Sequence, residues 1–307
     1  MLLPSQQAEY DRQGFLILRG QLTSCALDEL RIIVAPLLEP AHGGHRPAHT
    51  PLLLSLAQQA GGGVAACLIS WLHTYIVPTV ADLLMERSMR YSMLSILNGG
   101  DPTQQYRQHW HKDCHWWFHG ITQGSANEAA VGKLCHRRHV QFSVPINAQD
   151  SFLQVIPSSY SRTSTAKECS ASFNFLQQRD VAQETCSMEV NTGTLPDATT
   201  IQLDPGDIGV WDMNLLHRGW NPTGSQRCTI FGSYFTADTP VLQHEAGQTH
   251  SVKDAIETLR KRHISSDSIE PLDKFLKAHP TDGGELGTLL NLLRKHRMVT
   301  MQAKGKL

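Results

Sequence analysis

The hydrophobic positions of the chain follow two patterns: short runs typical of strands in the middle, and helical spacing toward both ends. Residues 14–20 predict a short strand that ends at a glycine, and the apolar positions between 24 and 37 predict a helix with one buried face. Five later segments have the composition of short strands separated by turn-forming residues: 91–97, 139–146, 200–203, 208–211 and 228–235. From residue 251 onward the leucines and isoleucines return to helical spacing.

Many short strands between helical ends predict a mainly β fold with flanking helices. Its core is expected to be a double-stranded β-helix of the jelly-roll or cupin-like kind. The chain has 307 residues, of which 40% are hydrophobic and 18% charged, enough for one large domain with a sizeable core. We therefore expect a single domain over 1–307, in which 251–307 form a helical C-terminal extension.

The net charge of −1 offers no basic field that could hold nucleic acid or an anionic membrane. The most apolar run, 65–85, is interrupted by His73, Pro78 and Asp82, which favours a buried helix over a membrane span. We therefore expect neither nucleic acid nor a membrane as a partner. The oligomeric state stays open at this point.

The seven cysteines are scattered and form no CxxC pair, so neither a zinc ribbon nor a disulfide framework is indicated. Reduced thiols are the simpler interpretation. The first residues have neither the basic start nor the apolar stretch of a signal peptide, and we expect a cytoplasmic protein. The C-terminal Gly-Lys-Leu is similar to the peroxisomal Ser-Lys-Leu signal, which keeps the peroxisome as an alternative.

The segment 108–115 (QHWHKDCH) is the richest in candidate metal ligands. In a strand, residues two apart share a face, so His111 and Asp113 can reach one point inside a barrel. A second histidine would complete a face of three ligands and leave the other positions of an octahedron open. That donor set is diagnostic of non-haem iron(II) oxygenases.

His217 is the predicted third ligand, because it follows a turn and a strand over 206–212 and precedes a predicted turn at 218–222. Ten residues later, Arg227 opens another strand. A guanidinium that points into a barrel needs an anion, and its planar fork matches a carboxylate. The distal carboxylate of 2-oxoglutarate is the natural partner of Arg227.

The ordered set of HxD, a distant histidine and an arginine ten residues later resembles the phytanoyl-CoA dioxygenase family. Three further stretches resemble motifs of that family: residues 10–20 (YDRQGFLILRG) its opening strand, 155–162 (VIPSSYSR) its VVPGSHR turn, and 206–207 the GD pair before the distal histidine. The resemblance covers about residues 8–236. It implies that iron(II) is bound by His111, Asp113 and His217, and that 2-oxoglutarate and O₂ are cosubstrates.

The resemblance also implies that Gln108 contacts 2-oxoglutarate, although strict strand alternation would point it away from His111, so a local bend is needed. The chain departs from the family on one strand. Ser158 and Tyr160 replace the Gly and His of PGSH, residues 150–151 replace the preceding Asn-Gly, and a cosubstrate-binding threonine falls on Leu153. These departures concern cosubstrate contacts on that strand and not the metal site.

The residues that follow the predicted ligands are candidates for substrate contact. His115, Trp116 and Trp117 are expected near the cavity, although the two tryptophans point to opposite faces of a strand and at most one can line it. The small and polar segment 120–135 is long for a strand connection. It predicts a loop that closes over the substrate.

The expected function is that of a 2-oxoglutarate-dependent dioxygenase. It would hydroxylate, desaturate or epoxidise an unactivated C–H bond of a small organic molecule, an intermediate of natural-product biosynthesis. The carboxylate of Asp113 favours oxygenation over halogenation, since the related halogenases have a small residue there.

Several alternatives to this function differ in what they require. An acyl-CoA hydroxylase would need a basic patch for the CoA phosphates, and a non-catalytic metal-binding protein on the same fold should have lost a ligand. A Jumonji-type demethylase would usually bind 2-oxoglutarate through lysine. A cupin-like enzyme without 2-oxoglutarate would leave Arg227 without a role.

Overall fold

The computed structural model describes residues 1–38, 49–52, 55–56, 60, 62–85, 89–98, 106–108, 110–113, 124, 126–172, 195–221 and 227–236. The helices are α1 (Pro4–Gln13), α2 (Ser24–Leu38), α4 (Gly62–Tyr75), α5 (Val77–Leu84), α7 (Ala126–Cys135), the 3-10 helix η1 (Ser159–Ser161) and α8 (Ala166–Ala171). The strands are β1 (Phe15–Leu18), β2 (His49–Pro51), β3 (Met89–Asn98), β4 (Tyr106–Arg107), β5 (His139–Pro145), β6 (Asp150–Val155), β7 (Thr199–Leu203), β8 (Ile208–Asp212), β9 (His217–Asn221) and β10 (Cys228–Thr236).

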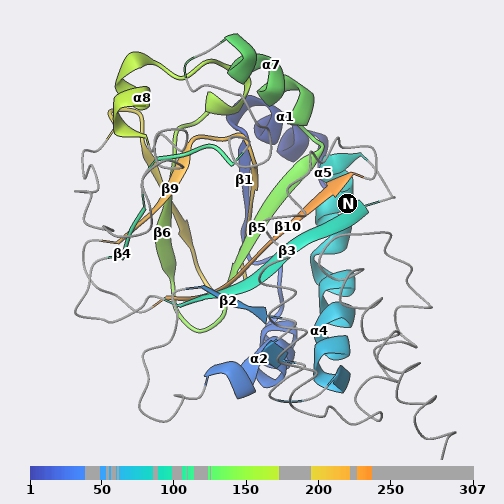
Figure 1. The fold of residues 1–307 in the computed structure, drawn as a ribbon. Helices are drawn as coiled ribbons and strands as arrows, with labels where there is room; N and C mark the ends of the chain where they lie inside the picture. The colour runs from blue at the N-terminus through green and yellow to red at the C-terminus, as the bar shows by residue number, and fades with distance from the viewer. Residues whose placement is uncertain are drawn as a thin grey trace, which may run out of the picture.

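The strands form two sheets that face each other, with helices on the outside (Figure 1). The larger sheet has the order β1-β8-β5-β10-β3-β2, and the smaller one has the order β4-β9-β6-β7. Every strand pairing recorded within the sheets is antiparallel. This arrangement confirms the predicted mainly β fold with flanking helices.

The central strand β5 shows how the sequence divides the two faces of the larger sheet. Val140, Phe142 and Val144 are fully buried in a cluster that includes side chains of α2, α4 and α5. Gln141 and Ser143 alternate with them and are therefore on the face toward the smaller sheet. On β5 the apolar face packs against the helices, while the face toward the smaller sheet carries polar side chains.

Two of the helices on this outer face form the most apolar stretch of the described chain. No single described helix is long and apolar enough to cross a membrane. Only α4 and α5 taken as a pair, bent by 50° at their junction, pass such a test by length and composition. Trp71, Leu72, Val80 and Leu83 on these helices are buried in the protein core.

Three local predictions differ from the structure. Residues 126–135 of the predicted loop form α7, because alanine, glutamate, leucine and lysine are strong helix formers even where the segment is rich in small and polar residues. The predicted turn at 218–222 is mostly the strand β9, which pairs with β6 and β4. Strand spacing is predicted for His111 and Asp113, whereas in the described part of the chain β4 ends at Arg107 and isolated bridges occur at Trp110 and His111. The expected C-terminal helices, 251–307, lie outside the described residues.

Candidate metal centre

The backbone places two of the predicted ligands directly opposite each other. His111 N donates to His217 O at 3.0 Å and His217 N donates to His111 O at 3.0 Å, which closes an isolated antiparallel bridge. Opposite residues of such a bridge carry their side chains on the same face. Asp113 is anchored two residues later, where its backbone N donates to Met213 O at 3.0 Å.

The three side chains converge on one point. His111 Nε2 lies 3.5 Å from Asp113 Oδ1, and His217 Nε2 lies 3.9 Å from Asp113 Oδ2. The ligand atoms of the three residues all lie within 4.8 Å of one another, as needed to share a metal ion. The structure thus brings together the three residues that were predicted from the sequence to be metal ligands. Two imidazoles and one carboxylate suit a borderline divalent metal such as iron(II).

The orientation of the His217 side chain is determined by a backbone carbonyl two residues earlier in the chain. Its Nδ1 lies 2.8 Å from the carbonyl oxygen of Leu215. A carbonyl only accepts hydrogen bonds, so Nδ1 carries the proton and donates. In the neutral imidazole, the lone pair is then on Nε2, the nitrogen that faces Asp113. This arrangement is typical of a metal-binding histidine, in which the second ring nitrogen is held by a carbonyl or a carboxylate.

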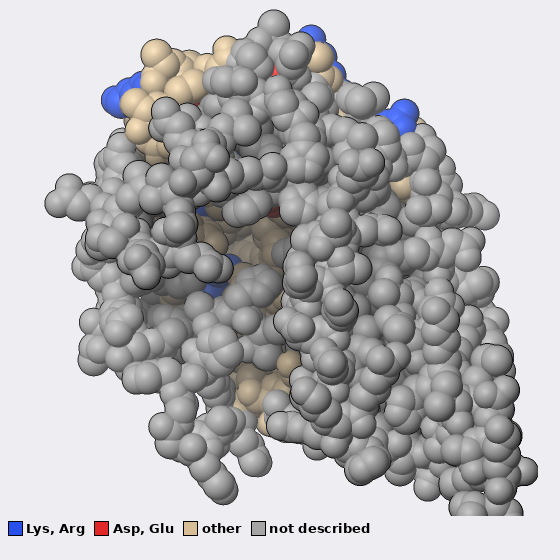
Figure 2. Space-filling model, in the orientation of Figure 1, with Lys and Arg blue, Asp and Glu red and all other residues tan. Residues whose placement is uncertain are grey.

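The three residues open into a cavity of about 180 Å³ that Gln108 and Arg227 also line. Figure 2 shows one face of the molecule, which is hollowed near its centre. The Oε1 of Gln108 accepts from Gly219 N at 2.9 Å, while Gln108 N donates to Gly219 O at 2.9 Å. Gln108 thus lines the same cavity as His111.

Arg227 has a partner that the sequence did not predict. Its Nε donates to Asp150 Oδ2 at 2.8 Å, and both side chains are buried. Thr229 Oγ1 donates to the same oxygen, and Phe152 N donates to Asp150 Oδ1. Burial alone would raise the pKa of Asp150, but Arg227 and these hydrogen bonds hold it below its usual value. Arg227 is thus held in an ion pair at the cavity wall.

The other side chains of the cavity wall that bear on a substrate are apolar. They are Leu97, Leu153, Trp211 and Phe231. The rings of Trp211 and Phe231 are stacked with centroids 5.7 Å apart. The rings of Trp211 and His217 form an edge-type contact, with centroids 6.3 Å apart and planes at 60°. A wall of this kind can hold an apolar part of a small molecule beside the three ligands.

The side chain between His111 and Asp113 faces the opposite way. Lys112 is fully buried, and its Nζ donates to Ser159 O at 2.8 Å, to Arg162 O at 3.0 Å and to Glu128 Oε1 at 2.9 Å. An ammonium group has three N–H donors, so these three acceptors use all of them. Lys112 therefore connects the segment of the candidate ligands to η1 and to α7.

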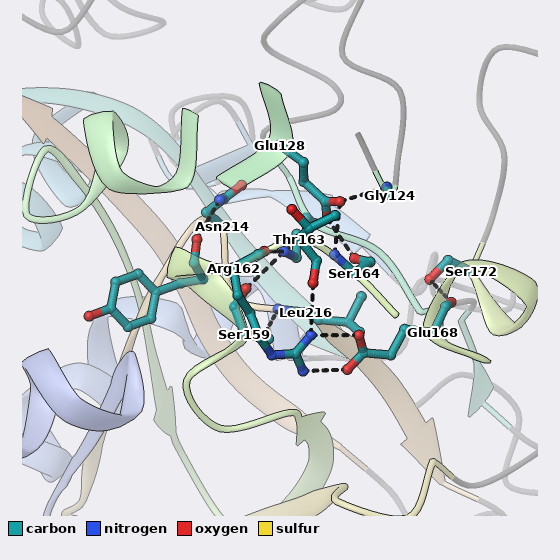
Figure 3. Close-up of polar contacts among 12 residues, drawn as sticks. Gly124, Glu128, Ser159, Arg162, Thr163, Ser164, Glu168, Ser172, Asn214 and Leu216 are labelled. Carbon is teal, nitrogen blue, oxygen red and sulfur yellow. Dashed lines mark hydrogen bonds and ion pairs between the residues drawn. The ribbon is translucent and has the colours of Figure 1, made fainter. Parts of the chain in front are cut away.

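Glu128, the partner of Lys112 on α7, is equally buried, and Figure 3 shows its hydrogen bonds to Gly124 and Ser164. Its Oε1 accepts from Ser164 Oγ at 2.6 Å, and its Oε2 accepts from Gly124 N at 2.7 Å and from Ser164 N at 3.0 Å. Burial alone would raise the pKa of Glu128, but Lys112 and Ser164 lower it. The carboxylate therefore stays charged, and the ion pair is hydrogen-bonded on both sides.

Gln141 is a further polar residue at the candidate centre that sequence reasoning missed. Its Nε2 donates to Asp113 Oδ2. Nearby, burial lowers the pKa of His139 to about 4, although Asp113 acts in the opposite direction. The signal was present, because His139, Gln141 and Ser143 place polar side chains on one face of an otherwise apolar strand. His115, Trp116 and Trp117 lie outside the described residues, so the predicted substrate contacts remain predictions.

Comparison with known proteins yields a fold and no sequence relative. No model of a known protein family matches the chain, and no curated protein matches it in sequence. Among solved structures, AviO1 from Streptomyces viridochromogenes Tue57 is 16% identical with a TM-score of 0.50, over 77% of this chain and 96% of AviO1. EctD from S. alaskensis in its apoform is 18% identical with a TM-score of 0.50, over 76% of this chain and 77% of EctD.

HygX from Streptomyces hygroscopicus, in a structure with nickel and 2-oxoglutarate bound, is 16% identical with a TM-score of 0.49. The match covers 78% of this chain and 88% of HygX. At such low identity it is the fold that AviO1 and EctD share with this chain. That fold agrees with the double-stranded β-helix predicted from the sequence.

Proposed function

We propose that the protein is a non-haem iron(II), 2-oxoglutarate-dependent oxygenase that acts on a small organic molecule. The observation that carries this proposal is the convergence of His111, Asp113 and His217 within 4.8 Å at the wall of a cavity. Three protein ligands on one side of a metal leave room for a chelating cosubstrate and for O₂. In this proposal iron(II), 2-oxoglutarate and O₂ together supply the oxidising power for an unactivated C–H bond.

The chain's own residues have distinct tasks in this proposal. The carbonyl of Leu215 holds the imidazole of His217 with Nε2 toward the metal. Arg227 provides the positive charge at the cavity wall for the distal carboxylate of 2-oxoglutarate, and Asp150 keeps its guanidinium in place. The Oε1 of Gln108 is engaged by Gly219, so its contact with the cosubstrate would be made through Nε2.

The substrate would lie against the apolar wall of the cavity. Trp211 and Phe231 present stacked rings, and Leu97 and Leu153 complete this side, so water is displaced where substrate carbon atoms bind. This composition supports an organic substrate with an apolar or cyclic part, such as a natural-product intermediate. Asp113 keeps a carboxylate at the centre, which supports oxygenation over halogenation.

The test measures metal and cosubstrate together. Protein purified without metal is titrated anaerobically with Fe(II) and then supplied with 2-oxoglutarate, O₂ and a panel of small-molecule substrates. We expect about one Fe(II) per chain and succinate release that depends on 2-oxoglutarate. Protein that binds Fe(II) equally well after His111, Asp113 and His217 are each replaced by alanine would contradict the proposed centre.

Two other functions fit the observations less well. An acyl-CoA hydroxylase would need cationic groups for the CoA phosphates, and among the described cavity-lining residues Arg227 alone is cationic and already pairs with Asp150. A non-catalytic binding protein would not need all three ligands, a cation and an apolar wall around one cavity. A protein that releases no succinate from Fe(II), 2-oxoglutarate and O₂, with or without any member of the panel, would favour the non-catalytic alternative.

A further inference from the structure

Gln141 occupies a central and enclosed position. It lies in β5, opposite Trp211 of β8 and Ser233 of β10, and its exposed fraction is 3%. Its neighbours Val140 and Phe142 point to the helices on the outer face of the sheet. Gln141 therefore points between the two sheets, where the three candidate ligands are.

The side-chain amide of Gln141 makes a hydrogen bond to one of the candidate ligands. Its Nε2 donates to Asp113 Oδ2, and a carboxylate can only accept, so the orientation of the amide follows from this bond. Within the described part of the chain, its Oε1 is buried and has no hydrogen-bond partner. Buried polar atoms are nearly always paired, and those that are not are often kept for a functional reason. For Gln141, the functional reason that we consider is the hydrogen bond that Nε2, at the other end of the same amide, donates to Asp113.

We propose that Gln141 is a positioning residue of the metal site. By holding Oδ2 of Asp113, it directs Oδ1, which lies 3.5 Å from His111 Nε2, toward the point shared with the two imidazoles. Metal-binding carboxylates are commonly oriented by such a donor, and its loss reduces metal affinity. This inference rests on the proposed function, because it gives Gln141 a role only if Asp113 binds the metal.

The principal test replaces Gln141 with a residue of similar length that cannot donate. Gln141→Met is compared with the wild-type chain by titration with Co(II), which substitutes for Fe(II) and has visible absorption bands that depend on its ligands. We expect Co(II) affinity to fall about ten- to a hundredfold and the bands to change. Thermal unfolding with and without Co(II) separates the two roles, since a merely structural residue would leave the metal-induced rise in Tm unchanged.

The control is Ser143→Ala. Ser143 lies two residues along the same strand, on the same face and just as buried, and it makes no recorded hydrogen bond to the candidate ligands. We expect this variant to keep wild-type Co(II) affinity and absorption. If Gln141→Met does not fold, Gln141→Asn keeps the amide but is one methylene too short to reach Asp113, and the same losses are expected.

The outcomes distinguish this inference from the proposed function. Wild-type protein and Asp113→Ala are measured first. If the wild type binds no Co(II), or binds it independently of Asp113, the proposed metal centre is wrong and the role of Gln141 falls with it. If the wild type binds Co(II) through Asp113 but Gln141→Met has the same affinity and spectrum, the metal centre stands and only the role of Gln141 is overturned.

Discussion

The two faces of the segment 110–113 contrast sharply. His111 and Asp113 face the cavity, where their side chains stay partly exposed and one side of the wall is apolar. Trp110 and Lys112 face outward and are fully buried. Trp110 packs in an apolar cluster with Ile156 and Leu216, and Lys112 uses every donor of its ammonium group.

This contrast between the two faces explains how a short segment with few strand pairings can hold two candidate ligands in place. Among the described residues, the segment makes few ladder hydrogen bonds, because β4 ends before it and isolated bridges follow at Trp110 and His111. Its position depends instead on the outward side chains, which tie it to α7 and η1. We therefore expect substitutions on the inner face to change metal binding, and substitutions on the outer face to change the free energy of unfolding.

The largest expected effect comes from breaking the inner face alone. His217→Ala should abolish measurable Fe(II) binding and turnover, because it removes one of only three protein ligands. The free energy of unfolding of the metal-free protein should change little, since the imidazole borders a cavity and, within the described part of the chain, makes one hydrogen bond, to Leu215 O. Metal titration and urea unfolding on the same samples check both statements. A large loss of metal-free stability would show that the inner face also carries the fold.

The next largest effect comes from breaking the outer face. Lys112→Met leaves the buried carboxylate of Glu128 without its cation and should reduce the free energy of unfolding by about 3–5 kcal/mol. The double variant Lys112→Met/Glu128→Gln removes both charges and should lose less. Urea unfolding measures each change.

The control for this prediction is an exposed ion pair. Asp28→Asn removes the surface pair with Arg31, in which the exposed fraction of Asp28 is 65%, and should change stability by at most about 1 kcal/mol. If Lys112→Met is as mild as this control, the buried pair does not hold the segment.

The sequence predicted the inner face better than the outer one. His111 and Asp113 could be selected because a spacing of two residues puts side chains on one face, and the order of His217 and Arg227 completed the set. Lys112 could not be selected in this way, since its partner Glu128 is contributed by α7, and that segment was expected to be a loop. The acceptors of Lys112 at Ser159 and Arg162 are backbone carbonyls, which leave no trace in side-chain identity.

The ion pair of Arg227 at the cavity wall likewise could not be predicted from the sequence. Asp150 stands at a position that departs from the resembled family, and Arg227 is predicted to need an anion, but nothing in the sequence connects the two residues. They are far apart in the chain and meet only because β6 and the start of β10 are brought together by the fold. Alternation within β5, in contrast, was visible in the sequence and marks Gln141 as a polar residue on the inner face.

A smaller effect on the inner face is expected at this ion pair. Arg227→Met alone would leave Asp150 as a buried unpaired carboxylate, so the informative variant is Asp150→Asn/Arg227→Met. It should retain Fe(II) but bind 2-oxoglutarate about ten- to a hundredfold more weakly, which corresponds to about 1.5–3 kcal/mol for a charge-assisted hydrogen bond. Calorimetric titration with 2-oxoglutarate measures this. Unchanged affinity would assign Arg227 to a purely structural ion pair.

The smallest expected effect concerns a second anchor of α7 on the outer side. His136, directly after this helix, has Nδ1 2.9 Å from Asp212 Oδ2 and Nε2 3.0 Å from Asp11 Oδ1. When both carboxylates are ionised they only accept, so both ring nitrogens donate and the ring is an imidazolium. The ring is stacked on Tyr160, with the two ring centroids 4.3 Å apart. Burial acts to lower the pKa of His136, but the hydrogen bonds and charges of Asp212 and Asp11 outweigh it and raise the pKa.

A pKa raised in the folded state gives a contribution with a definite pH window. It is complete below the unfolded value near 6.5 and is lost as the pH rises through the folded-state pKa. His139, whose folded pKa is about 4, acts the other way and loses its contribution as the pH falls below about 6.5. We therefore expect the unfolding free energy of the metal-free wild type to exceed that of His136→Gln at pH 6, and the difference to shrink toward alkaline pH. The contribution of His139 to the free energy of unfolding is the same in both proteins and cancels in this difference. Urea unfolding from pH 6 upward measures it, and a difference independent of pH would mean that His136 anchors α7 through packing and not through its charge.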